Sequence, residues 1–411
     1  ARSDDQPSGA PDDGLTLTDV WGYGFEFPEG TATGRAGLDF VRRVPVPAPT
    51  ELVVTTVDDA GPGSLREALG TIADGGTITF DPSLTGSTLA LQSGQLQIDR
   101  SVTIDGQDAA PLTISGDNAS RVFEVAAGTT VELAHLTVRD GVAAPQGGGI
   151  LNRGTLTLDH VVVTNNTENS AAPANFAFGG GGIYNGDYAT LRLVDSTVSN
   201  NTAVNQPAGG VYGSFDSNVE IIRSTVSGNS SGDVAGGLRS LGNATILNST
   251  FSGNTSTAWH GGGVFHTNGS LTVTNSTFAE NVAPAGTASG ILVATFGAPA
   301  DMTITNSVVQ GHGGAFACAI EGGGAATITS GGGNVISDTS CNPDGPGDQS
   351  ETDALLGPLA DNGGANHTHA LLAGSPAIDA ALAGACPATD QLGTSRPQGA
   401  ACDVGAFELV P

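Results

Sequence analysis

An eight-residue segment recurs along the middle of the chain, and this repeat constrains the fold more than any other feature. It begins at residues 131, 156, 191, 219, 244, 271 and 302, so that successive copies start 25 to 35 residues apart. A fixed motif at variable spacing is typical of a solenoid, in which every coil has the same cross-section but carries loops of different length.

Each copy alternates apolar and polar residues. In the copy at 156 the first and third residues, Leu156 and Leu158, are apolar, and the second and fourth, Thr157 and Asp159, are polar. A period of two indicates a β-strand with one buried face. A second strand follows after a short corner and directs one apolar residue inward, such as Phe251 or Phe278. Glycine-rich runs such as 261–264 precede the segment and predict a third strand that follows a tight turn. Three short strands in about 25 residues predict an all-β, right-handed parallel β-helix of about ten coils.

Polar residues stack at the two corners of the aligned coils. Asparagine tolerates left-handed backbone geometry and can hydrogen-bond along a stack of identical side chains. We therefore predict asparagine ladders. The ladder residues are Asn248, Asn275 and Asn306 at the first corner, and Asn201, Asn229, Asn254 and Asn281 at the second, where Asn166 precedes them and His312 follows.

Charged residues occupy the first corner in the earlier coils. Asp159, His160, Asp195 and Arg223 fall on successive coils along one edge, with Arg192 nearby. Polysaccharide lyases and hydrolases share this architecture, and such enzymes use Arg or Lys bases beside calcium or clustered carboxylates. These four residues are the candidates for catalysis. The alternative, which we favour, is that they are surface ion pairs within the corner column.

The charge of the chain excludes two classes of partner. It has 41 acidic against 13 basic residues and a net charge of -28. Nucleic acid and anionic lipid both need a basic surface, so we expect neither as a partner. No apolar run is long enough to span a bilayer. The sequence holds no metal-binding motif and predicts no cofactor, and Ca²⁺ is the cation that so acidic a surface can attract.

All four cysteines lie in the last hundred residues. Their even number predicts two disulfides and an oxidising compartment. Sequence order suggests Cys318 with Cys341 and Cys386 with Cys402, although four cysteines allow three pairings.

Residues 1–50 do not follow the repeat. They hold an aromatic, strand-like run and a proline-rich linker at 44–49. An aromatic strand on an extended tether predicts a docking element, which binds either its own β-helix or a neighbouring molecule. The predicted docking residues are Leu15, Leu17, Val20, Trp21, Tyr23, Phe25 and Phe27.

Three groups of motifs resemble bacterial surface proteins. Glycine runs followed by Phe251-Ser-Gly-Asn254 or Phe278-Ala-Glu-Asn281 resemble the repeats of polymorphic outer-membrane proteins. Residues 63–69, 369–379 and 402–408 resemble the end segments of bacterial β-helix proteins of the choice-of-anchor type, with Gly63 where that family has Cys. The resemblance implies export and display at the cell surface, without enzymatic activity.

The sequence thus predicts an N-terminal extension at 1–50, a β-helix at 51–350 and a C-terminal capping region at 351–411. A short helix that begins at Ser64 should cover the first coil, and the Cys386–Cys402 loop should close the last. The predicted function is that of a secreted structural or adhesive surface protein, such as a filament subunit that self-associates through its N-terminal strand. A glycan-binding adhesin and a polysaccharide lyase or hydrolase are the alternatives.

Overall fold

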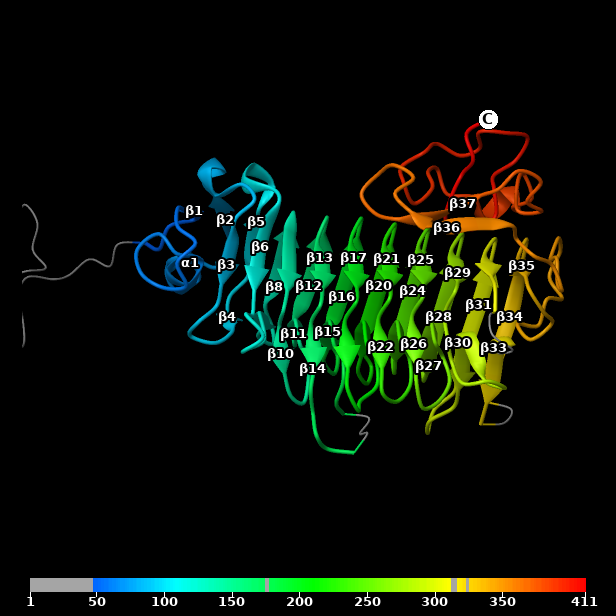
Figure 1. Cartoon of the computed structure of the whole chain (residues 1–411), viewed down its shortest axis with the longest axis horizontal. Coiled ribbons are helices and arrows are strands. Elements are labelled where there is room, and N and C mark those ends of the chain that lie inside the picture. The colour runs from blue at the N-terminus through cyan, green and yellow to red at the C-terminus, as the bar shows by residue number, and fades with distance from the viewer. Residues whose placement is uncertain (1–46, 174–176, 312–315, 323–324) are drawn as a thin grey trace, which may run out of the picture. The chain divides into compact units, whose positions relative to one another are not determined.

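The computed structural model describes residues 47–173, 177–311, 316–322 and 325–411 (Figure 1). The predicted docking residues between Leu15 and Phe27, and His312 of the second corner, lie outside the described residues. The described part is a parallel β-helix, which confirms the predicted fold class.

Three parallel sheets form the sides of the coil, and each coil passes through sheet III, then sheet I, then sheet II. Within the described residues, sheet I has eleven strands, sheet II ten and sheet III nine. Sheet I contains β1 (Glu51–Val54), β2 (Gly76–Phe80), β5 (Val102–Asp105), β8 (Thr130–Ala134), β12 (Thr155–Asp159), β16 (Thr190–Val194), β20 (Asn218–Ile222), β24 (Asn243–Leu247), β28 (Gly269–Thr274), β31 (Ala300–Thr305) and β34 (Ala326–Gly332). Sheet II contains β3 (Thr88–Ala90), β6 (Leu112–Ser115), β9 (Leu136–Arg139), β13 (Val162–Thr164), β17 (Thr197–Ser199), β21 (Thr225–Ser227), β25 (Thr250–Ser252), β29 (Thr277–Ala279), β32 (Val308–Val309) and β35 (Val335–Ile336). Sheet III contains β4 (Leu96–Ile98), β7 (Phe123–Val125), β11 (Ile150–Asn152), β15 (Ile183–Asn185), β19 (Val211–Gly213), β23 (Leu238–Ser240), β27 (Val264–Thr267), β30 (Ala288–Ala294) and β33 (Phe316–Glu321).

Two smaller sheets complete the strand pairing. Two-residue strands just after the second corner form a short parallel sheet in five successive coils. They are β10 (Val142–Ala143), β14 (Thr167–Glu168), β18 (Thr202–Ala203), β22 (Ser230–Ser231) and β26 (Thr255–Ser256). In the C-terminal region β36 (Leu356–Ala360) and β37 (Thr368–Leu371) pair antiparallel.

The strand register matches the repeat read from the sequence. Leu156 pairs with Val131 on one side and Leu191 on the other, and the pairing continues through successive coils to Met302. The inward residues of all three sheets are buried in one continuous core. Phe251 and Phe278 stack inside it with ring centroids 5.0 Å apart. Burial of such a side chain stabilises the fold by about 1.5–3 kcal/mol.

The N-terminal end is covered by α1 (Leu65–Thr71), as Figure 1 shows. Ser64 is its N-cap and accepts a hydrogen bond from the Glu67 amide at 3.2 Å, while the Glu67 carboxylate accepts one from the Gly63 amide at 2.6 Å. This reciprocal capping satisfies amides that the helix itself cannot bond. Leu65 and Leu69 of the helix are buried in the main core.

Residues 351–411, here called the strap, lie along the outer side of sheet II (Figure 1). We predicted that this region closes the last coil, and the observed contacts place it beside five coils instead. Short 3-10 turns η2 (Pro82–Leu84), η3 (Gln107–Ala109) and η4 (Ala383–Ala385) occur in the connecting loops and the strap.

Candidate functional site

The corner between sheets I and II carries the predicted catalytic residues. His160, Asp195 and Arg223 occupy successive levels of it, and His135 lies one level earlier; all four have φ between 47° and 54°. Such left-handed geometry is uncommon for these residue types. It arises here because the chain passes from one sheet to the next within two residues, and the side chains then point outward along the column.

The structure brings the four candidates together as bonded pairs. The Arg223 guanidinium donates to both carboxylate oxygens of Asp195, at 2.9 and 2.5 Å. This bond raises the pKa of Arg223 above its usual value. His160 Nδ1 lies 2.8 Å from Asp159 Oδ1, and the His160 ring stacks on His135 at 5.1 Å between centroids. Arg192, which we placed near these residues from the sequence, pairs with Glu220 on the outer face of sheet I instead.

The same cluster has ligands that suit a divalent cation. One ligand atom from each of Asp159, His160 and Asp195 lies within 4.8 Å of the others. Two carboxylates and an imidazole are acceptable donors for several divalent metals. Both oxygens of Asp195 are already bonded to Arg223, however, so that a cation would compete with the guanidinium for that carboxylate.

The second corner carries a continuous asparagine ladder. The side-chain amide of each asparagine donates to the carboxamide oxygen of the next at 2.9–3.0 Å. The main-chain amide of each donates to the same oxygen. The ladder consists of Asn166, Asn201, Asn229, Asn254 and Asn281. These buried bonds join each coil to the next at the end of sheet II.

A parallel serine ladder escaped the sequence-based prediction. In five successive coils the residue after the first-corner residue is serine, and each serine amide donates to the hydroxyl of the next serine at 3.1–3.2 Å. The ladder runs through Ser196, Ser224, Ser249, Ser276 and Ser307. The recurrence of serine at one position of the repeat was the signal that could have identified it.

The first-corner asparagines do not form the ladder that we predicted. Among the described residues, Asn248 and Asn306 bind the strap instead of one another, and the Asn275 amide, in the orientation that satisfies both its oxygen and its nitrogen, donates to the Ala385 carbonyl of the strap. Asn248 donates to the Thr389 carbonyl at 2.8 Å, and Asn306 exchanges two bonds with the main chain of Leu382, at 2.7 and 3.1 Å. The prediction failed because an outward-pointing amide can bond any main chain laid across the corner, and the repeat pattern contains no information about the strap.

Hydroxyl groups on the outer face of sheet II complete the docking of the strap. Gln391 accepts from Thr250 at 2.7 Å and donates to Thr225 at 2.8 Å. His369 is buried and lies 2.9 Å from the Ser252 hydroxyl. Thr277 accepts from the Ala406 amide at 3.0 Å. These polar contacts bind the strap to three neighbouring strands of sheet II, β21, β25 and β29.

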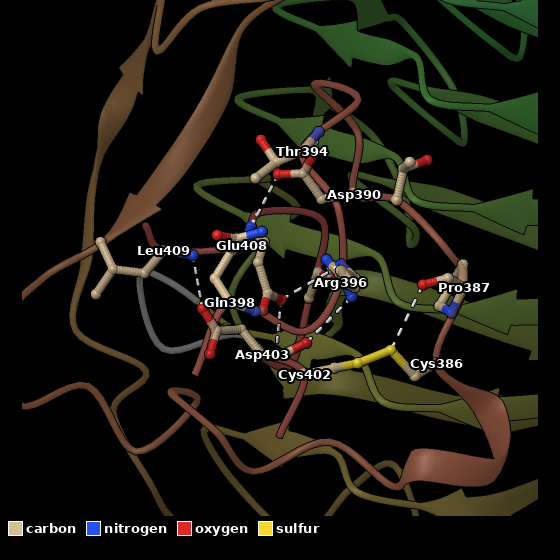
Figure 2. Close-up of polar contacts among 12 residues, drawn as sticks. Cys386, Pro387, Asp390, Thr394, Arg396, Gln398, Cys402, Asp403, Glu408 and Leu409 are labelled. Atoms are coloured by element: carbon tan, nitrogen blue, oxygen red, sulfur yellow. Dashed lines mark hydrogen bonds and ion pairs between the residues drawn. A yellow bond between two sulfur atoms is a disulfide. The ribbon is translucent and has the colours of Figure 1, made fainter. Parts of the chain in front are cut away.

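The strap has a charged interior of its own, which Figure 2 shows. Arg396 donates to the Asp403 and Gly405 carbonyls and lies 3.5 Å from Glu408. Asp390, Asp403 and Glu408 accept main-chain amides that fix the surrounding loops. Burial raises the pKa of Asp403 and of Glu408, and it lowers that of Arg396. Side-chain hydrogen bonds from these residues thus hold the loops of the strap, which has little regular secondary structure.

The disulfides join Cys318 to Cys341 and Cys386 to Cys402, which confirms the pairing suggested by sequence order. The first disulfide lies in the β-helix core and the second within the strap.

A groove of about 550 Å³ opens where the strap's leading loop meets sheet II. Hydroxyl and amide groups line much of it, including Thr197, Ser199, Asn366 and His367. Thr197 follows the first-corner residue Asp195 by two positions, so the charged corner column borders this groove. We call it the strap groove, and together with the charged corner it is the candidate functional site.

Comparison with known proteins agrees with this architecture. Residues 148–340 match the family model of the right-handed beta helix region. The solved structure titled "Crystal structure of pectate lyase Pel9A" is similar over 87% of this chain and 96% of that chain, with 13% sequence identity and a TM-score of 0.49. No curated protein matches the chain. The fold is thus a right-handed β-helix, and the narrower resemblance to bacterial surface families stays a prediction.

Among the described residues no helix has the length and apolar character needed to cross a membrane.

Proposed function

We propose that the protein is an exported, non-enzymatic β-helix with a structural or adhesive role at or outside the cell surface. The observation that carries the proposal is the pairing at the first corner. Asp195 has both oxygens bonded to Arg223, and Asp159 is bonded to His160. Groups held in this way continue the corner column and supply neither a free base nor a free acid.

The devices that stabilise the fold support an extracellular role. Two buried ladders and the docked strap join the coils of the β-helix, and one disulfide in the core and one within the strap add covalent links. Disulfides form and persist in oxidising compartments. The net charge of -28 keeps such a surface soluble and disfavours unspecific association. Self-association through residues 1–50 is part of the proposal, and it rests on the aromatic run and the proline-rich linker alone.

A polysaccharide hydrolase is the second candidate, because one specific observation favours it. Asp159 and Asp195 bring carboxylate oxygens within 4.8 Å of each other beside an open polar groove. Retaining glycosidases place two carboxyl groups at about 5 Å. The two candidates differ in whether the groove supports turnover.

The deciding experiment measures turnover on a panel of acidic and neutral polysaccharides, with and without Ca²⁺. We expect no release of reducing or unsaturated ends above the blank. Asp195→Asn is the test variant, and Glu220→Gln is the matched control, because Glu220 also pairs with an arginine but lies away from the groove. Release that is lost in Asp195→Asn and kept in Glu220→Gln would overturn the proposal; reducing ends without unsaturation would establish a hydrolase, and unsaturated ends a lyase.

A further inference from the structure

A second apolar layer lies outside sheet III. The outward residues of four successive strands are in register, and all four are buried: Tyr184, Tyr212, Arg239 and Phe265. The two tyrosine rings stack at 4.8 Å between centroids. The Arg239 guanidinium lies 4.0 Å from the centroid of the Phe265 ring. Outward residues of a β-helix are normally exposed, so the connecting loops must cover this column.

The connecting loops leave an opening over the coil that contains Phe265. A hollow of about 310 Å³ forms there, and its buried lining residues are Val234, Phe265 and Leu292. Two exposed aromatic residues complete the apolar part of the lining, Trp259 with 60% of its surface accessible and Phe296 with 47%. We call this feature the aromatic hollow. Its volume is at the lower end of the range of about 300–1,000 Å³ found for small-molecule sites.

The position of Trp259 is fixed by its main chain. The Trp259 amide donates to the Asp233 carbonyl at 3.2 Å, and its carbonyl accepts from the Ser256 hydroxyl at 2.7 Å. The indole is therefore presented at the surface by a held loop. A large exposed aromatic ring in such a loop loses little conformational entropy when a ligand binds.

Polar groups surround the apolar walls. His260 Nε2 lies 2.7 Å from Glu321 Oε1, and Asp233 also lines the hollow. A ligand that fits must be apolar in the centre and carry hydrogen-bonding groups at its edge. A pyranose ring has this chemistry, because one face presents C–H groups and hydroxyls project around the rim.

Electrostatics selects the charge of the ligand. The chain carries a net charge of -28 and two carboxyl groups line the hollow, which disfavours anions. A cation is disfavoured on Phe265, because the Arg239 guanidinium already lies over that ring and repels a second positive charge. A neutral ligand avoids both penalties, and the apolar walls suit it.

We infer that the aromatic hollow binds a neutral sugar at the exposed end of a glycan, with the C–H face of the ring on Trp259. Asp233 and the His260–Glu321 pair accept hydrogen bonds from its hydroxyls. The site lies outside sheet III, whereas the strap groove lies on sheet II. Binding in the hollow is therefore independent of whether the strap groove supports turnover.

The test uses the full chain on an array of glycans that end in glucose, galactose, mannose or N-acetylglucosamine, with sialylated and uronic-acid glycans for comparison. The chain has two tryptophans, so Trp21→Phe leaves Trp259 as the one fluorescent indole. Titration of that variant with the best neutral oligosaccharide should shift its emission. Trp259→Ala should weaken binding about tenfold or more, and Trp259→Phe should retain most of it.

Tyr188→Ala is the matched control, because Tyr188 is also an exposed aromatic residue, with 77% of its surface accessible, and lies outside the hollow. It should bind like wild type. Because Trp259 is largely exposed, Trp259→Ala should keep the circular dichroism of wild type. The inference fails if no neutral glycan binds, if Trp259→Ala binds as well as Tyr188→Ala, or if only charged glycans depend on Trp259.

Discussion

Replacement of Asn229 by alanine tests the part of the structure that joins coil to coil. Asn229 lies in the middle of the buried ladder, and its side chain makes four hydrogen bonds of 2.9–3.0 Å. Its oxygen accepts the main-chain and side-chain amides of Asn201, and its nitrogen donates to the Val198 carbonyl and to Asn254. Alanine removes all four without offering water a route to the site.

The magnitude follows from which groups lose their partners. The Asn201 side chain keeps a bond to the Val163 carbonyl, and Asn254 still accepts from the main-chain amide at 229. The main-chain amide of Asn201 loses its acceptor and stays buried. An unsatisfied buried donor costs about 1–3 kcal/mol, and the lost bonds and the small cavity add to this. We therefore expect Asn229→Ala to lower the free energy of unfolding by about 2–4 kcal/mol.

Urea unfolding followed by far-ultraviolet circular dichroism measures the effect as a shift of the midpoint. Asn218→Ala is the matched control, because Asn218 is exposed in sheet I and its side-chain oxygen accepts one long bond of 3.4 Å from Asn243. An exposed change of this kind should stay within about 0.5 kcal/mol of wild type. If Asn229→Ala unfolds at the same urea concentration as Asn218→Ala, the ladder does not stabilise the coils and the reasoning is refuted.

Three further predictions concern the core, the pH dependence and association. Phe251→Ala should destabilise the fold by about 3–5 kcal/mol, because it leaves a cavity beside Phe278; an unchanged urea midpoint would contradict the inward packing. Burial raises the pKa of Glu168 to about 6, so that, as the pH is lowered, this carboxyl takes up a proton at a higher pH in the folded protein than in the unfolded chain. The melting temperature should therefore rise as the pH is lowered from about 7.5 to about 5. Glu168→Gln should lose the part of this rise that comes from Glu168, whereas the exposed control Glu51→Gln should keep it. Deletion of residues 1–46 keeps the main-chain hydrogen bonds of Pro49 and Thr50 to the first coils. It should abolish self-association measured by sedimentation, with or without Ca²⁺. If the shortened chain assembles as well as the full chain, association does not depend on the N-terminal strand.

The fold could be predicted from the sequence because each coil repeats the same local pattern. The alternation at Leu156 and Leu158 sets which face is buried, and a slip of one residue would expose the whole apolar set. Register is therefore fixed coil by coil, and the observed pairing of Leu156 with Leu191 follows from the sequence alignment. The N-terminal helix was predictable for a similar local reason, because Ser64 and Glu67 have the spacing of a capping box.

The strap could not be placed from the sequence, because its contacts are neither local nor periodic. Asn248 bonds a carbonyl 141 residues further along the chain, and Asn306 bonds one 76 residues away. The residues of the end motif were visible, but their partners were not. Asp403 and Glu408 accept amides within the strap, and His369 reaches a serine of sheet II.

The aromatic hollow was also outside the reach of the repeat pattern. Trp259 and His260 lie in a loop between sheets II and III, where length and sequence vary from coil to coil. Phe265 alternates with inward residues and therefore belongs to the outer face of β27, which predicts exposure. The loops that bury it fold back over the sheet, and nothing in the strand pattern specifies that layer.

The first-corner residues are charged or histidine up to Arg223 and asparagine after it, and the change occurs at the coil where the strap starts to cover the corner. The contacts with the strap explain this change. Asn366 of the strap donates to the Arg223 carbonyl at 2.7 Å, and the later corner residues Asn248 and Asn306 bind the strap main chain. An amide can both donate to a carbonyl and accept from an N–H, as Asn306 does with Leu382, whereas a carboxylate only accepts and a guanidinium only donates. Before Arg223 the column stays open to solvent, and His160 and Asp195 there bond their neighbours instead. Of the charged residues that first suggested catalysis, Asp159, His160 and Asp195 therefore precede the part of the corner that the strap covers, and Arg223 lies where that cover begins.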